Sequence, residues 1–199
     1  MNEHVERYFR DLQEALDTVH CTGSRDETLS RDEAFERTLG IAEAAAVAGN
    51  KQMFIGNGGS AAIASHMAID FSKNAGLPAV CFNDAAALTC LGNDFGYDEV
   101  FAQQIRFHAL RGDVLFAISS SGTSKSILNA VEAGAERGCR TITLSGFSSG
   151  NPLRRMGEVN FHVEVAQYGI VEVAHTALIH AVVEIKRAAD RLSMAAAVD

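Results

Sequence analysis

The sequence predicts an α/β fold in which helices cover both faces of a parallel sheet. From Lys51 onward, short apolar segments alternate with longer segments of helical periodicity. The apolar segments do not alternate with polar residues, which is typical of strands buried on both faces. Alternating strands and helices build parallel sheets, because right-handed crossovers return each strand in the same direction.

Two helices are expected before this α/β core. Residues 2–20 carry an apolar face at helical spacing, formed by Val5, Phe9, Leu12, Leu16 and Val19. Residues 22–29 are polar and are expected to form a loop. Ser30 then begins a second helix, with Glu33 completing a capping box, and Gly49 follows its end. Such leading helices suggest packing against another copy of the chain, and packing on their own sheet is the alternative.

The core elements follow from the same periodicity. Strands are expected at 52–56, 78–82, 113–118, 140–145 and 159–164. Helices are expected at 60–72, 84–92, 98–110, 124–137 and 170–194. With only two prolines and no Pro/Gly/Ser linker, the chain of 199 residues is expected to be one domain. It comprises a helical pair at 1–48 and an α/β core at 51–195.

Composition narrows the class of protein. A net charge of −8 and a pI near 5.3 argue against nucleic acid or a membrane surface as the main partner. No apolar run approaches the ~20 residues of a membrane span, and the charged N-terminus lacks the apolar core of a signal peptide. A cytoplasmic protein is therefore expected. The four cysteines have no close paired spacing, so Cys81 and Cys90 are interpreted as buried reduced thiols.

The first candidate site lies between the first core strand and the helix after it. Gly56-Asn57-Gly58-Gly59-Ser60 separates an apolar strand from an Ala-rich helix. Free N–H groups at a helix N-terminus bind phosphate, and the helix dipole adds about half a positive charge there. His66 and Asp70 stand four residues apart on this helix, hence on one face. A phosphate cradle and an imidazole–carboxylate pair thus share one element.

A second cradle follows the strand at 113–118. Ser119-Ser120-Ser121-Gly122-Thr123-Ser124 offers hydroxyls and a helix N-terminus, both suited to phosphate oxygens. An ordinary serine-rich helix cap is the alternative. The other strand–loop–helix favours the phosphate interpretation, because ligands gather at the carboxyl ends of parallel strands. The loop is not a P-loop, since Gly-Lys-Ser/Thr is absent.

Two further groups are ambiguous from chemistry alone. Glu172, Thr176 and His180 form a stripe on the last helix, where a lone histidine is more often a satisfied core residue than a catalyst. Residues 92–97 indicate a helix stop followed by a loop. The alternative interpretation of residues 92–97 is that Asp94 contacts a polyhydroxylated ligand. Chemistry alone favours the helix stop.

Together these motifs resemble a known family. GNGGSAA, HMAID, LGNDFG, ISSSGTS and HTALIH are similar to the sugar isomerase (SIS) domain family, and more closely to its phosphoheptose isomerases, over residues 1–195. The resemblance implies a flavodoxin-like three-layer sandwich around a five-stranded parallel sheet, and a homotetramer with active sites between subunits. It implies isomerisation of sedoheptulose 7-phosphate to D-glycero-D-manno-heptose 7-phosphate through an enediol, as in heptose biosynthesis.

The resemblance also implies roles for individual residues. Asp70 and His180 match the catalytic positions. The positions expected to bind zinc are His66, Asp70, Glu172 and His180. The positions expected to bind substrate are Asn57, Gly58, Gly59, Ser60, Asp94, Ser119, Ser120, Ser121, Ser124 and Glu172.

The chain departs from the family pattern at three places. The family usually has glutamate at the position of Asp70 and glutamine at that of Glu172. The segment after the first core helix is short and lacks the family's substrate arginine, with Lys73 as the available cation. Two histidines with two carboxylates make a better zinc set than the family's own. The alternative function is a non-catalytic SIS module that binds a sugar phosphate or a protein partner, such as a replication-initiator-binding or regulatory protein. Such a module has no need of the imidazole–carboxylate set.

Overall fold

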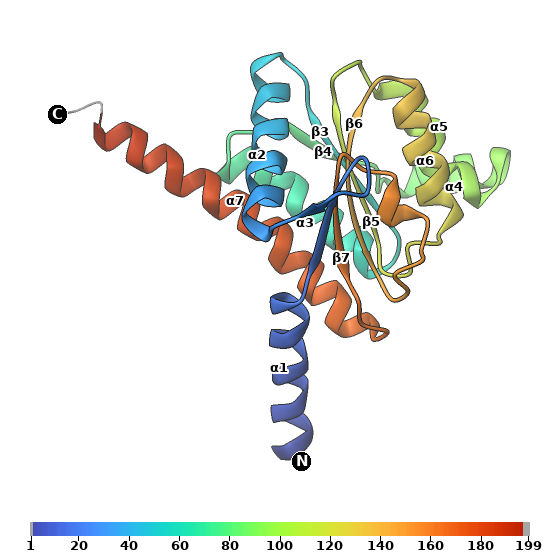
Figure 1. The fold of residues 1–199 in the computed structure, drawn as a ribbon. Helices are drawn as coiled ribbons and strands as arrows, with labels where there is room; N and C mark the ends of the chain where they lie inside the picture. Colours follow the sequence, from blue (N-terminus) through green and yellow to red (C-terminus); the bar gives the residue numbers. More distant parts are fainter. Residues whose placement is uncertain (1, 197–199) are drawn as a thin grey trace.

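The computed structural model describes residues 2–196 as an α/β protein with one sheet between two groups of helices (Figure 1). The strands are β1 (His20–Gly23), β2 (Thr28–Leu29), β3 (Gln52–Gly56), β4 (Ala79–Cys81), β5 (Val114–Ser119), β6 (Arg140–Gly146) and β7 (Val159–Val163). The helices are α1 (Asn2–Asp17), α2 (Arg31–Val47), α3 (Gly59–Asn74), α4 (Ala85–Phe95), α5 (Val100–His108), α6 (Lys125–Glu136) and α7 (Tyr168–Ala196), with 3-10 turns η1 (Tyr97–Glu99) and η2 (Leu153–Arg155).

The sheet has seven strands in the order β2-β1-β7-β6-β5-β3-β4, which corrects the expected count of five. The five expected strands pair in parallel. The additional two form a hairpin that pairs antiparallel with β7, where the sequence predicted a loop at 22–29. Strands of four and two residues are too short to show periodicity. Their pairing depends on the open edge of β7, which lies far away in the sequence.

The apolar strands place a core on each face of the sheet. On one face Phe54 stacks on Phe116, with ring centroids 4.6 Å apart, under α2, α3 and α7. On the other face Met53 and Leu115 pack under α5 and α6. Neighbouring residues of one strand therefore enter different cores, because successive side chains point to opposite faces. This confirms the prediction of doubly buried strands for β3, β5, β6 and β7. The prediction is wrong for β4, which lies at the edge of the sheet and exposes Val80.

Two helix ends differ from expectation by about one turn. Ser30 caps α2 with the predicted capping box, its hydroxyl accepting from the Glu33 N–H. α1 ends at Asp17 rather than near residue 20, because the chain turns there into β1. α4 continues through Asp94 and ends at Phe95, followed by the C-cap Gly96, whose φ of 85° favours glycine. The predicted helix stop at residue 92 is therefore wrong by one turn.

α7 is the longest helix, and its middle part packs against α3 (Figure 1). Within the described residues it is the one helix long and apolar enough to cross a membrane, with a mean hydropathy of 1.3 over its most apolar window. Of that window, 44% is buried in the protein. The core helix of a globular protein can be equally long and apolar. Cys81 is half-buried and Cys90 is exposed, so the expectation of buried thiols is wrong for Cys90 and only partly met for Cys81.

Candidate active site

The first cradle forms where β3 meets α3. β3 ends at Gly56, where a Cβ would lie 2.5 Å from the Ser60 backbone, so only glycine allows this close approach. Gly58 has a φ of 54° and caps α3 without a side chain. Gly59 opens the helix against α7, where a Cβ would overlap the Glu172 carboxylate. The glycines thus allow a tight turn that leaves the N-terminus of α3 open.

The second cradle lies beside it, because β3 and β5 are neighbours. β5 ends at Ser119, and Ser124 is the residue before α6. Together the two cradles enclose a pocket of about 200 Å³. Seven predicted substrate residues line it: Asn57, Ser60, Ser119, Ser120, Ser121, Ser124 and Glu172. Ile118 and Tyr168 also line it and were not predicted.

One buried hydroxyl in this pocket, that of Ser120, has no partner within residues 2–196. Ser119 accepts a hydrogen bond from the Gly122 N–H at 3.2 Å, and Ser121 accepts from the Thr123 hydroxyl at 3.1 Å. The Ser120 side chain is 5% exposed, and its Oγ has no hydrogen-bond partner within residues 2–196. A buried hydroxyl without a partner costs about 1–3 kcal/mol. Because Ser120 also lines the pocket, its hydroxyl is suited to donate a hydrogen bond to a ligand bound there.

Tyr97 is a site residue that sequence reasoning missed. Its Oη donates to Asn57 Oδ1 at 2.7 Å. Asn57 Nδ2 then faces the hydroxyls of Ser124 and Ser126, at 3.0 and 2.9 Å. Tyr97 fixes the orientation of the Asn57 amide and joins η1 to both cradles. Its position directly after Gly96 was the only sequence signal, and that signal was not specific.

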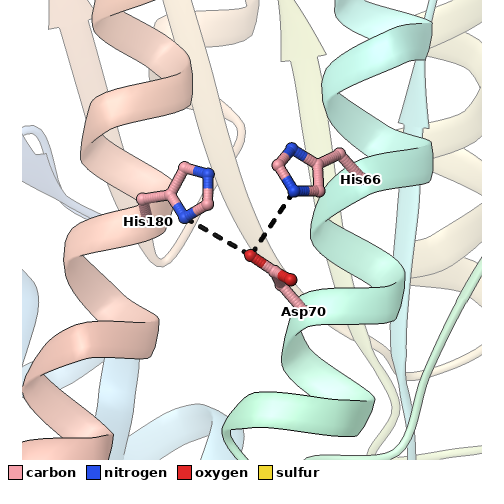
Figure 2. Close-up of side chains that lie close together, drawn as sticks. All are labelled: His66, Asp70 and His180. Carbon is pink, nitrogen blue, oxygen red and sulfur yellow. Dashed lines mark ion pairs between the residues drawn. The ribbon is translucent and has the colours of Figure 1, made fainter.

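A second group of polar side chains lies further along α3 and α7. His66 and Asp70 of α3 point toward His180 of α7 (Figure 2). Asp70 Oδ2 is 3.6 Å from His66 Nε2 and 3.4 Å from His180 Nδ1. The two imidazole rings meet edge to face, with centroids 5.0 Å apart. Asp70 is mostly buried, whereas the His66 side chain is 55% exposed, so the cluster opens to solvent.

The remaining predicted residues lie elsewhere. Glu172, the fourth residue of the expected zinc set, lies beside Gly59 in the cradle pocket and outside the group of potential metal ligands. Asp94 is exposed on the last turn of α4, where it accepts from Asn93 at 2.9 Å and does not line the cradle pocket. Lys73 is exposed at the end of α3.

The donor set of His66, Asp70 and His180 fits a metal ion. Two imidazole nitrogens and a carboxylate oxygen lie within 4.8 Å of one another. Zinc at catalytic sites takes three such protein ligands and leaves a position open for water or substrate. Tetrahedral ligands about 2.1 Å from zinc are about 3.4 Å apart, close to the observed 3.4 and 3.6 Å. The three residues can therefore hold zinc after small movements.

Two other histidines are structural. His175 is fully buried, and its Nε2 contacts the Ser145 carbonyl at 3.0 Å. His162 Nδ1 contacts the Ser145 hydroxyl at 3.0 Å. Burial lowers the pKa of each imidazole to about 4, because the charged form loses its hydration. They join β6, β7 and α7 in the neutral form.

Comparison with known proteins identifies the family of this fold. The SIS domain model matches residues 11–146, so the chain has an SIS domain. The phosphoheptose isomerase of Citrifermentans bemidjiense is 35% identical over 158 residues, covering 76% of this chain and 82% of that protein. That of an Enterobacter species is 32% identical over 183 residues, covering 88% and 92%.

A solved structure agrees with these relatives. The phosphoheptose isomerase of Neisseria gonorrhoeae superposes with a TM-score of 0.81 at 31% identity, covering 93% of this chain and 98% of that one. The chain therefore belongs to the phosphoheptose isomerases of the SIS domain family.

Proposed function

We propose that this protein is an aldose–ketose isomerase that converts sedoheptulose 7-phosphate to D-glycero-D-manno-heptose 7-phosphate. One observation carries the proposal: a phosphate cradle and an imidazole–carboxylate cluster lie on the same pair of helices, α3 and α7. The names of the relatives support it, because the phosphoheptose isomerases are about a third identical over most of the chain.

The cradle binds the phosphate. The N-termini of α3 and α6 both face the pocket, and their free N–H groups and dipoles favour an anion. Ser120 supplies a buried donor that is otherwise unsatisfied. Glu172 carries the one acidic side chain of the pocket lining, and it accepts hydrogen bonds from sugar hydroxyls.

The spacing of the two groups favours a long substrate. At about 1.5 Å per residue, Asp70 lies about 15 Å along α3 from Ser60, and His180 about 12 Å along α7 from Glu172. An extended heptose 7-phosphate spans eight bonds from C1 to phosphorus, about 10 Å at ~1.2 Å a bond. The Asp70 and His180 side chains shorten the distance to the cradle, because they project toward the N-termini of their helices. A triose phosphate held in the cradle does not reach the cluster.

Asp70 and His180 share the proton transfers. Isomerisation removes the proton from the hydroxyl-bearing carbon, passes through an enediol, and delivers a proton to the former carbonyl carbon. A second proton moves between the two oxygens. One group of the pair acts on carbon and the other on oxygen, since both lie within reach of one small ligand at the mouth of the cluster. A zinc ion held by His66, Asp70 and His180 would act as a Lewis acid on the carbonyl.

We also propose that the protein works as a cytoplasmic homotetramer. Val5 and Phe9 on α1 are 51% and 62% exposed, and within residues 2–196 only Ala15 of this helix is buried. α1 projects from the body of the protein (Figure 1). Leu12 and Leu16 pack against the protein's own core, whereas Val5 and Phe9 remain available to another copy. Sedimentation velocity of the full chain measures the assembly directly.

The experiment that tests the function is a turnover assay paired with metal analysis. Tag-free protein is assayed with sedoheptulose 7-phosphate, and its metal content is measured by plasma mass spectrometry. We expect turnover, near-stoichiometric zinc, and loss of turnover on chelation that zinc restores. Absence of turnover with and without zinc contradicts the proposal and favours the non-catalytic binding module.

A further inference from the structure

Asn74 is the last residue of α3, one helical turn beyond Asp70. Its Nδ2 donates to Asp70 Oδ1 at 2.9 Å, and the side chain is half-buried. The other carboxylate oxygen, Oδ2, is the atom that faces both His66 and His180. The two oxygens of Asp70 therefore have separate partners, an amide on one and two imidazoles on the other.

We propose that Asn74 is a positioning residue that orients the Asp70 carboxylate toward the two histidines. The proposal rests on the function proposed above. Rotation about the last side-chain bond of Asp70 exchanges Oδ1 and Oδ2, and it changes the angle at which either oxygen faces the imidazoles. A donor on Oδ1 favours one orientation, as partners behind a metal-ligating or catalytic carboxylate commonly do.

The position of Asn74 suits this role. The amide is four residues from Asp70, so both side chains lie on one face of α3. Asn74 is also distant from the cradle, because fourteen residues separate it from Ser60 at the other end of the helix. A change at Asn74 is therefore expected to alter the cluster and leave phosphate binding intact.

The main test is Asn74→Ala, with Co²⁺ as a spectroscopic probe for the metal site. We expect the affinity for Co²⁺ and the value of kcat each to fall by about 10–100-fold, the usual effect of removing a partner behind a ligand. KM for sedoheptulose 7-phosphate and inhibition by inorganic phosphate are expected to stay within about twofold, since the cradle is untouched. The visible spectrum of bound Co²⁺ is expected to change, because the carboxylate binds at a different angle.

A control variant separates the proposed effect of the Asn74 side chain from the effect of removing any side-chain amide on a helix. Gln103→Ala removes an amide that donates to Glu99, four residues away, on the other face of the sheet. It is expected to leave Co²⁺ affinity and kcat as in the wild type. Asn74→Leu keeps about the size of the side chain but has neither an N–H donor nor a charge, and is expected to match Asn74→Ala. It keeps the test decisive if the alanine variant is poorly folded.

The outcomes distinguish the two proposals. Variants of Asn74 that bind Co²⁺ with wild-type affinity and spectrum and keep wild-type kcat overturn the role of Asn74. Weakened Co²⁺ binding in a protein whose wild type has no turnover supports Asn74 and overturns the isomerase function. A wild type with neither Co²⁺ binding nor turnover overturns both.

Discussion

At the residue scale, Ser120 and Asp70 carry separate parts of the proposed reaction. Ser120 has a buried hydroxyl with no partner in the described chain, which costs folding free energy unless a ligand accepts its hydrogen bond. Asp70 is the only described residue that contacts both His66 and His180 through one oxygen. Substitutions at these residues therefore separate binding from chemistry.

Ser120→Ala is expected to weaken phosphate binding without destabilising the fold. A hydrogen bond to a charged group contributes about 1.5–3 kcal/mol, so KM should rise about 10–100-fold. The free energy of unfolding should not fall, since the native hydroxyl has no protein partner to lose. Steady-state kinetics and urea unfolding measure the two effects, with Ser193→Ala on the exposed end of α7 as the control. A less stable variant with unchanged KM would contradict this role.

Asp70→Asn is expected to abolish turnover while the cradle still binds phosphate. A neutral amide neither accepts a proton nor attracts a cation, so kcat should fall about 10²–10⁴-fold, as for loss of a general acid or base. Competition by inorganic phosphate, measured by calorimetry, should be unchanged. If the variant retains wild-type turnover, Asp70 has no part in proton transfer.

At the scale of elements, the end of β6 determines how closely α7 and the second cradle approach each other. A Cβ at Gly146 would lie 2.7 Å from the Val171 side chain of α7 and 3.0 Å from the Ser120 backbone oxygen. Val171 is fully buried and stiff at χ1, so it cannot move aside. The absence of a side chain at Gly146 thus holds three elements of the site together.

Gly146→Ala is expected to destabilise the protein by about 1–3 kcal/mol through overpacking. It should also raise KM, because the Ser120 loop must shift. Gly40→Ala is a matched control in the interior of α2, where an added Cβ meets nothing within 4 Å. That variant should gain about 0.5–1 kcal/mol from helix propensity. Urea unfolding of both variants checks the prediction, which is wrong if both gain stability.

At the scale of the whole molecule, the buried histidines couple folding to pH. Burial holds the folded pKa of His162 and of His175 near 4, below the ordinary value of 6.5. Between these values the unfolded chain binds protons that the folded chain does not. The contribution of these two neutral, buried histidines to the stability of the fold is therefore complete above about pH 6.5, and it decreases as the pH falls toward 4.

As the pH falls from 6.5 toward 4, the free energy of unfolding should decrease by up to about 1.4 kcal/mol per pH unit for each of the two histidines. Urea unfolding at pH 7.5, 6.0 and 5.0 measures the slope. His175→Gln should reduce the slope by about half, since the variant lacks one of the two buried imidazoles that bind a proton on unfolding. His4→Gln, on exposed α1, should leave the slope unchanged. Equal slopes in the wild type and in His175→Gln would exclude His175 as a source of the slope.

The sequence predicted the two cradles of the candidate site more fully than the cluster around Asp70. The cradles were predictable because each is a continuous loop between a strand and a helix. His66 and Asp70 were paired correctly, since residues four apart share a face of any helix. Asn74 follows the same rule and was missed, because an amide at a helix end is equally typical of a stop signal.

The sequence by itself determined the α/β class, the five parallel strands, the capping box of α2 and the two strand–loop–helix segments that line the cradle pocket. Each is set by local periodicity or by a short run of residues with few backbone alternatives. The tertiary structure alone decided that His180 meets Asp70, that Glu172 lies at Gly59, that Tyr97 orients Asn57, and that a hairpin extends the sheet. These contacts join residues far apart in the chain, and they depend on how the sheet places α3 beside α7 and leaves the edge of β7 open.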